Sequence, residues 1–86
     1  MHTVELMDAL LGVAEKLGYQ IRQEWLGGTG GGKCEFGGRR FIFVDLALSV
    51  VEQQEQIASA LRDDPALNTI PLSVPLRRAL GIRRAA

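Results

Sequence analysis

Apolar residues at the start of the chain recur every three or four positions, as they do on one face of a helix: Val4, Met7, Leu11 and Ala14. This spacing predicts an amphipathic helix over residues 3–17. Thr3 is a suitable N-cap for this helix, and Gly18 is suited to the left-handed conformation that ends many helices.

The pattern then changes to the alternation that is typical of strands. Residues 19–26 alternate between apolar and polar side chains, and Trp25 is expected to point into the core with the apolar ones. A glycine-dense loop over residues 27–32 leads to a short strand over residues 33–36.

A hairpin is expected around Gly37-Gly38, because glycine accepts the positive φ angles of a two-residue turn. The return strand, residues 39–46, contains the unbroken apolar run Phe41-Ile42-Phe43-Val44. Such a run predicts a central strand that is covered on both faces. Residues 19–26, which are polar on one face, are expected at an edge of the sheet.

The second half of the chain begins with a predicted helix. Ser49 and Glu52 have the spacing of a capping box, which predicts a helix that ends near Arg62. Apolar positions at helical spacing are expected to face inward: Val50, Ile57, Ala58 and Leu61. The outer face is expected to carry three glutamines: Gln53, Gln54 and Gln56.

Proline and glycine divide the remainder of the chain. Asp64 precedes Pro65 and is suited to cap a short turn after the second helix. A last helix is expected over residues 74–80, with Gly81 at its end and Ile82 folding back onto it.

The order of these elements predicts an α+β fold: a helix, a three-stranded and mainly antiparallel sheet, a second helix and a short C-terminal helix (αβββαα). Eighty-six residues suit one domain over residues 1–86, with residues 83–86 expected to be disordered. With 47% hydrophobic and 23% charged residues, the chain has the composition of a folded protein.

Charge and cysteine content limit which cellular compartment and which classes of partner are expected. Ten Lys and Arg balance ten Asp and Glu, so net charge points to neither nucleic acid nor membrane. Cys34 is the only cysteine, whereas a secreted domain of this size usually carries several. We find no signal-peptide pattern and no apolar run long enough to span a bilayer, so a cytoplasmic protein without membrane contact is expected.

Residues 27–33 match the phosphate-loop pattern G-x-x-x-x-G-K, but their surroundings favour a plain loop between strands. Cys34 stands where the motif needs Ser or Thr, and sulfur is a poor ligand for magnesium. Too few residues precede Gly37-Gly38 for a helix to follow the loop, and the chain is too short for a doubly wound parallel sheet. We therefore expect no nucleotide and no cofactor, while binding of another anion stays open.

Few side chains offer catalytic or metal-binding chemistry. The only histidine, His2, is expected to be solvated at the terminus, which argues against Ser-His or Cys-His catalysis and multi-histidine zinc sites. Cys34 is expected in the core beside Phe36, with a reactive thiol as the alternative. Asp63-Asp64 is expected to form a solvated turn. We therefore expect no enzyme and no metal site.

Positive charge is concentrated near the C-terminus. Residues 72–86 carry four arginines and no acid, whereas residues 49–71 have a net charge of −3. The candidate anion-binding residues are Lys33, Arg39, Arg40, Arg77 and Arg78, together with Arg83 and Arg84. The C-terminal arginines suit phosphate groups, but they equally suit the end of a helix or the acidic second helix.

Residues 37–64 resemble part of a known family. They run from a glycine turn through a strand that ends Val44-Asp45 to a helix that begins Ser49-x-x-Glu52-Gln53. This order is similar to the strand-to-helix unit of phage-repressor-cleaving (ImmA/IrrE-type) metallopeptidases, whose helix carries an H-E-x-x-H zinc motif.

That motif is absent from this chain. When the two helices are aligned on Ile57-Ala58, the zinc-ligand positions fall on Ser59 and Asp63 and the general base on Ala60. The resemblance therefore implies a scaffold without its catalytic centre. The whole chain also resembles small bacterial proteins of uncharacterised function with a glycine-rich loop, a cysteine and a Glu-Gln helix, which implies no activity.

These features predict a non-catalytic binding or protein-interaction module that acts through a protein partner or as a homodimer. The dimer is expected because residues 39–46 are apolar on both faces and a short sheet has exposed edges. In the competing arrangement, a monomer, the open sheet face is covered by Trp25, Leu76, Leu80 and Ile82. The alternative function is an anion or nucleic-acid binder that uses the cations named above.

Overall fold

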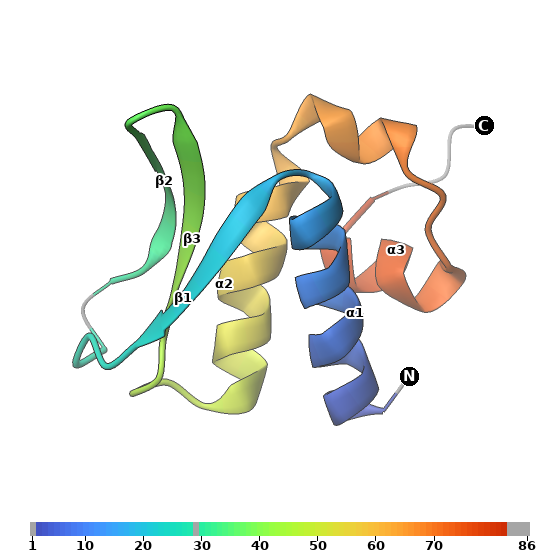
Figure 1. Cartoon of the computed structure of the whole chain (residues 1–86). Coiled ribbons are helices and arrows are strands. Elements are labelled where there is room, and N and C mark those ends of the chain that lie inside the picture. The colour runs from blue at the N-terminus through green and yellow to red at the C-terminus, as the bar shows by residue number, and fades with distance from the viewer. Residues whose placement is uncertain (1, 29, 83–86) are drawn as a thin grey trace.

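The computed structural model describes residues 2–28 and 30–82, and the prediction for residues 83–86 lies outside them. Helices and strands follow the predicted order (Figure 1). They are α1 (Thr3–Lys16), β1 (Tyr19–Glu24), β2 (Gly32–Phe36), β3 (Arg39–Asp45), α2 (Val50–Arg62), the 3-10 helix η1 (Pro65–Thr69) and α3 (Val74–Leu80). The predicted α+β class is confirmed.

The three strands form a mixed sheet in the order β1-β3-β2. The central position of β3 and the edge position of β1 are confirmed. The prediction of a mainly antiparallel sheet needs correction, because β3 pairs with β2 in antiparallel and with β1 in parallel orientation. After β1, the chain leaves room for one strand and forms β2 at the other edge of the sheet. The hairpin then brings β3 back into the space between β1 and β2.

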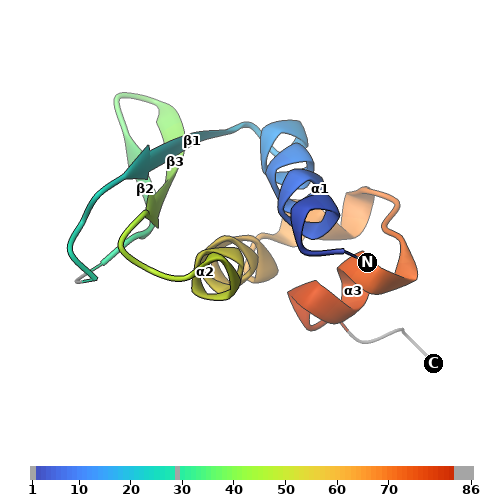
Figure 2. The same cartoon turned by 90° about the horizontal axis from the view of Figure 1, so that it is seen from below.

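All helices lie on one face of this sheet, as Figure 2 shows. Strand alternation directs Ile42 and Val44 of β3 toward the helices, where both side chains are fully buried. The other members of the core come mainly from the helices: Leu10, Val13, Ala14, Leu17, Tyr19, Ile57, Ala58, Ala60, Leu61, Leu67, Leu76 and Leu80. One hydrophobic core therefore lies between the sheet and the helices.

Three predicted core positions near the sheet are wrong. Trp25 follows the last paired residue of β1 and is 74% exposed. Cys34 and Phe36 lie on the strand face opposite the helices, and both are exposed. In addition, Leu76 and Leu80 pack in the main core, so they leave the other sheet face uncovered.

Two helix starts also differ from the prediction. His2, not Thr3, is the N-cap residue of α1, and Val4 is exposed. In α2, Val50 is exposed whereas Gln54 is buried. The Gln54 amide donates a hydrogen bond of 2.9 Å to the Thr3 carbonyl, so this contact between two helices explains why a glutamine faces inward.

The predicted caps are confirmed where they depend on near neighbours. Ser49 and Glu52 form both bonds of a capping box at the start of α2. Asp64 accepts a hydrogen bond from the Ala66 N–H and so caps η1. Gly81 has φ 71° after α3, and the Ile82 N–H donates to the Arg77 carbonyl over 2.9 Å. Among the described helices, none is long and apolar enough to cross a membrane.

Candidate functional site

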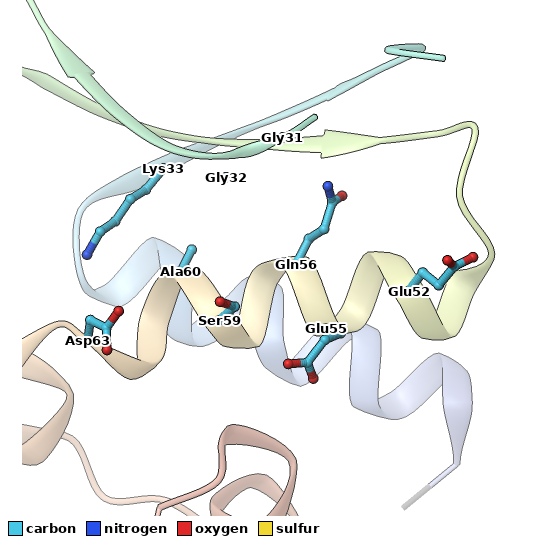
Figure 3. A pocket seen from close by; sticks show the side chains of 9 residues that line it. All are labelled: Gly31, Gly32, Lys33, Glu52, Glu55, Gln56, Ser59, Ala60 and Asp63. Carbon is cyan, nitrogen blue, oxygen red and sulfur yellow. The ribbon is translucent and has the colours of Figure 1, made fainter. Parts of the chain in front are cut away.

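A groove of about 560 Å³ lies between the free edge of β2 and one side of α2 (Figure 3). The strand side is formed by Gly31, Gly32 and Lys33. The helix side is formed by residues three or four positions apart, which share a face of α2 and its end: Glu52, Glu55, Gln56, Ser59, Ala60 and Asp63. This groove is called the β2–α2 groove below, and it exceeds in volume two other pockets of about 430 and 190 Å³.

The β2–α2 groove is acidic. The lining contains three carboxylates, those of Glu52, Glu55 and Asp63, and one ammonium group, that of Lys33, so its formal charge is −2. Glu55 points away from the strands in Figure 3 and forms an ion pair of 3.5 Å with Arg62, which offsets part of this charge. Figure 3 shows the Lys33 amine at the same end of the groove as Asp63, with Glu52 at the other end. The Ser49 backbone N–H lowers the pKa of Glu52, so this carboxylate is ionised at neutral pH.

The glycine-rich loop beside the groove is held by the carboxylate of Asp45. Its Oδ1 accepts hydrogen bonds of 2.9 Å from the N–H groups of Leu26 and Ala47, and its Oδ2 accepts one of 2.6 Å from Gly28. Burial raises the pKa of Asp45, but the three N–H donors lower it by more than burial raises it. The pKa of Asp45 therefore lies below its ordinary value. The loop therefore directs backbone N–H groups at a carboxylate of its own chain.

Gln56 links this loop to α2. Its Oε1 accepts a hydrogen bond of 2.9 Å from the Asp45 N–H, and its Nε2 donates one of 3.3 Å to the Gly30 carbonyl. The neighbouring Gly31 has φ 152°, and a Cβ atom there would lie 2.3 Å from Gln56 Nε2 and 2.8 Å from the Phe43 carbonyl oxygen. Only glycine permits this close approach, so at least one glycine of the loop is required by packing.

A second polar cluster lies at the other end of the sheet. Arg40 hydrogen-bonds to the carboxylate of Asp64 and to the hydroxyl of Tyr19, and its guanidinium lies 4.0 Å from the centre of the Tyr19 ring. The Arg40 hydrogen bond lowers the pKa of Asp64 to about 2, although burial opposes this. Burial and the nearby Asp64 raise the pKa of Tyr19.

This cluster corrects the prediction that Asp63-Asp64 is a solvated turn. Asp63 is exposed, but Asp64 is only 6% exposed because two side chains from the sheet meet it. Both partners lie far from Asp64 in the sequence, which offered no local signal for the contact.

The five predicted anion-binding cations do not gather in one place. Lys33 lines the β2–α2 groove and also a smaller pocket of about 190 Å³ that Arg40 shares. Arg40 is already bound to Asp64, and Arg39 is exposed at the start of β3. Arg77 and Arg78 belong to α3, which lies at the opposite side of the molecule from β2 (Figure 1).

Sequence reasoning missed the acidic side of the groove. The capping box accounts for Glu52 and a solvated turn for Asp63, so neither was a candidate for a binding site. The spacing of Glu55 and Asp63, 3 and 11 positions from Glu52, does place them on one side of a helix, and this was the available signal. The spacing does not indicate that the edge of β2 lies opposite these carboxylates and completes the groove.

The positions aligned with the zinc motif of the metallopeptidases, Ser59, Ala60 and Asp63, also line the groove. Within residues 2–28 and 30–82, no three His, Cys, Asp or Glu side chains lie close enough together to hold a metal ion. The family resemblance stays a prediction. Comparison of the chain with protein-family models, with curated proteins and with solved structures gave no match.

Proposed function

We propose that this protein is a non-catalytic interaction module that binds an extended, basic segment of a partner protein along the free edge of β2. One observation carries the proposal: the exposed edge of β2 lies directly beside a groove lined by three carboxylates. Backbone pairing supplies the affinity in this binding mode, and the groove supplies the preference for basic side chains.

The edge of β2 is suited to accept another strand. β2 pairs only with β3 in the described sheet, and the four residues from Lys33 to Phe36 are all exposed. A strand edge presents N–H and C=O groups that can pair with an added chain. Lys33 is the one charged residue that the groove side of this edge contributes, and a lysine on an edge strand disfavours indiscriminate pairing.

The groove selects the chemistry of the added strand. Alternate side chains of an extended segment point to the same face, so every second residue would enter the space above α2. Lysine or arginine side chains are long enough to extend from the strand layer toward Glu52 on the helix. An acidic residue of the partner suits the position near Lys33. Such a pair would fix which residue of the added strand lies opposite which residue of β2.

The same charge disfavours two other occupants of the groove. A second copy paired through β2 would bring two acidic α2 surfaces together, and like charges repel. A nucleic-acid backbone carries one negative charge per phosphate and meets the same repulsion. A basic polypeptide is the occupant whose charge is complementary to the groove.

The experiment uses two acetylated, amidated nonapeptides of alternating sequence, Lys-Val and Glu-Val, in calorimetric titrations at low salt. The Lys-Val peptide is expected to bind and the Glu-Val peptide is not. The double variant Glu52→Gln, Asp63→Asn should weaken binding about tenfold, because each exposed charge pair contributes up to about 1 kcal/mol. Glutamine at position 52 can still form the capping box with Ser49. The control, Glu5→Gln with Asp8→Asn, removes two carboxylates of α1 outside the groove and should bind as the original protein does.

Backbone methylation of the peptide tests the edge itself. N-methylation at alternate residues blocks the N–H groups of one side of a strand, so one of the two methylation patterns should abolish binding while the other preserves it. Equal binding of both methylated peptides, or equal binding of the Lys-Val and Glu-Val peptides, would show that the proposal is wrong.

A further inference from the structure

The face of the sheet opposite the helices carries an aromatic row. Strand alternation and the pairing register place ten residues on this face, called the open face: Gln20, Arg22, Glu24, Gly32, Cys34, Phe36, Arg39, Phe41, Phe43 and Asp45. Asp45 is buried by its bonds to the neighbouring loop. Phe41 and Phe43 alternate with Ile42 and Val44, which point into the core, and neither phenylalanine belongs to the core cluster. Figures 1 and 2 show α1, α2 and α3 on the other side of the sheet.

The aromatic side chains of the open face stack on one another. The ring centres of Phe36 and Phe41 are 4.7 Å apart, and those of Phe41 and Phe43 are 6.1 Å apart. Phe41 is only 5% exposed, whereas Phe36 at the end of the row is 57% exposed. The row thus extends from a shielded centre on β3 to a solvent-exposed ring on β2.

A strand that is apolar on both faces is typical of a sheet covered on both faces. Here the described helices cover one face only, so the open face has no second layer of helices or strands. Phe41 is shielded by side chains of the sheet itself, and Phe36 at the end of the row stays 57% exposed. We propose that a second copy of this chain supplies that layer, with the open faces of two protomers packed against each other around a two-fold axis.

Charge makes the open face compatible with its own copy. Arg22 and Glu24 form an ion pair of 3.3 Å on β1 with solvent-accessible side chains, and Arg39 is a further exposed charge on this face. A two-fold axis places the same patch on both sides of the interface, so Arg22 of one protomer can meet Glu24 of the other. The β2–α2 groove, with its charge of −2, lacks this self-complementarity.

The size of the open face indicates a reversible dimer. Three strands about 4.8 Å apart, the longest about 23 Å long, cover a plane of roughly 300 Å². Stable interfaces bury about 800 Å² per partner, so an interface of this smaller size is expected to be weak and to depend on protein concentration. The inference concerns a different surface from the one in the proposed function, and each can fail without the other.

Sedimentation equilibrium from about 10 μM to about 1 mM tests the dimer. The average mass is expected to rise with concentration from the monomer value of 9.4 kDa toward twice that value. Phe36→Asp should keep the protein monomeric, because it places a charge at the exposed end of the aromatic row. Val74→Asp is the matched control, since Val74 on α3 is 59% exposed, and it should associate as the original chain does.

Cys34 provides a second measurement that reports on the same face. It is the only cysteine of the chain and lies on the open face beside Phe41 in the pairing register. Its reaction with a thiol reagent should slow several-fold as the concentration of the original protein rises, and it should stay fast in Phe36→Asp. Circular dichroism of both variants verifies that they are folded.

Three results would contradict this inference. A constant monomer mass for the original chain would exclude the dimer over this range. Equal association of Phe36→Asp and Val74→Asp would place the contact elsewhere. Rapid formation of a Cys34–Cys34 disulfide between protomers under mild oxidation, with unchanged association of Phe36→Asp, would indicate pairing of two β2 edges instead, because residues opposite each other in adjacent strands lie within disulfide distance.

Discussion

The carboxylate of Asp64 accepts a hydrogen bond of 2.8 Å from the hydroxyl of Tyr19, although 45 positions separate the two residues in the sequence. Arg40 contacts both groups and also donates a hydrogen bond of 2.9 Å to the Leu17 carbonyl. The cluster therefore joins the end of α1, two strands and η1 at the side of the core. Because Asp64 also caps η1, one carboxylate stabilises both a local turn and a long-range contact.

Asp64→Asn is expected to lower the free energy of unfolding by about 1–3 kcal/mol, because it removes the charge that balances a partly buried Arg40. The neighbouring Asp63→Asn is the control, since Asp63 is exposed, and its effect should stay within about 0.5 kcal/mol. Urea unfolding followed by circular dichroism measures both. Equal stability of the two variants would show that the Asp64 cluster contributes nothing to folding.

Stability should fall at acidic pH. The pKa of Asp64 is about 2 in the folded chain and 3.8 in its ordinary state, so the unfolded chain binds a proton at a higher pH than the folded one. The stabilisation is therefore complete above about pH 5 and is lost as the pH falls toward about 2. Urea midpoints at pH 6, 4 and 2.5 should decrease in that order, and Asp64→Asn should show a weaker dependence. An identical slope in both proteins would assign the acid sensitivity to other carboxylates.

Gly31→Ala should destabilise the protein by about 1–3 kcal/mol, since the added Cβ meets the Gln56 side chain and the Phe43 carbonyl in a left-handed backbone conformation. Gly30→Ala is its matched control, because a Cβ atom at Gly30 meets nothing within 4 Å. That variant should be neutral or slightly stabilising, since alanine restricts the unfolded chain. Thermal unfolding distinguishes the two, and an equal loss in both variants would refute the close-approach argument.

The glycine-rich loop should not bind ATP or GTP at millimolar concentration with magnesium. The N–H groups of Leu26 and Gly28 donate hydrogen bonds to Asp45, so they are not directed at a phosphate. In addition, β2 rather than a helix follows the loop. We expect no change in melting temperature with either nucleotide, and the same result for Lys33→Ala. A nucleotide-induced shift of several degrees that Lys33→Ala removes would restore the phosphate-loop interpretation.

The hydrogen bonds between Asp45 and the glycine-rich loop can be tested without a ligand. Asp45→Asn should accelerate hydrogen exchange at the Gly28 amide, because asparagine keeps one acceptor oxygen, which can serve Leu26 and Ala47, and has an NH₂ donor in place of the oxygen that Gly28 meets. Exchange at the Glu52 amide, which the separate Ser49 cap holds, is the internal control. Unchanged exchange at Gly28 would mean that the loop keeps its conformation without this hydrogen bond.

Of the residues that line the candidate site, the sequence predicts only Lys33 as a binding residue, and Lys33 does line the groove. The acidic side was missed because each carboxylate had an adequate local explanation, and because the register that brings the β2 edge over α2 depends on the whole sheet. The aromatic row was anticipated only as a strand with two apolar faces, since the helices that cover one face and leave the other open are packed by long-range contacts.

The sequence by itself determined the order of the elements and their boundaries within a few residues. Those features depend on neighbours a few positions apart: the helical and alternating apolar patterns, the Ser49–Glu52 capping box, the Gly37-Gly38 turn and the Gly81 cap. Such interactions form between residues of one segment, so the local sequence is sufficient to predict them.

Only the tertiary structure decided the parallel pairing of β1 with β3, the exposure of Trp25 and the burial of Asp64 and Gln54. Each depends on which distant segment fills the space beside a side chain. A buried carboxylate is stable when a partner such as Arg40 is present and costly when it is absent, and a local pattern does not contain that partner. The same reason explains why the acidic groove and the open aromatic face emerged from the fold rather than from a motif.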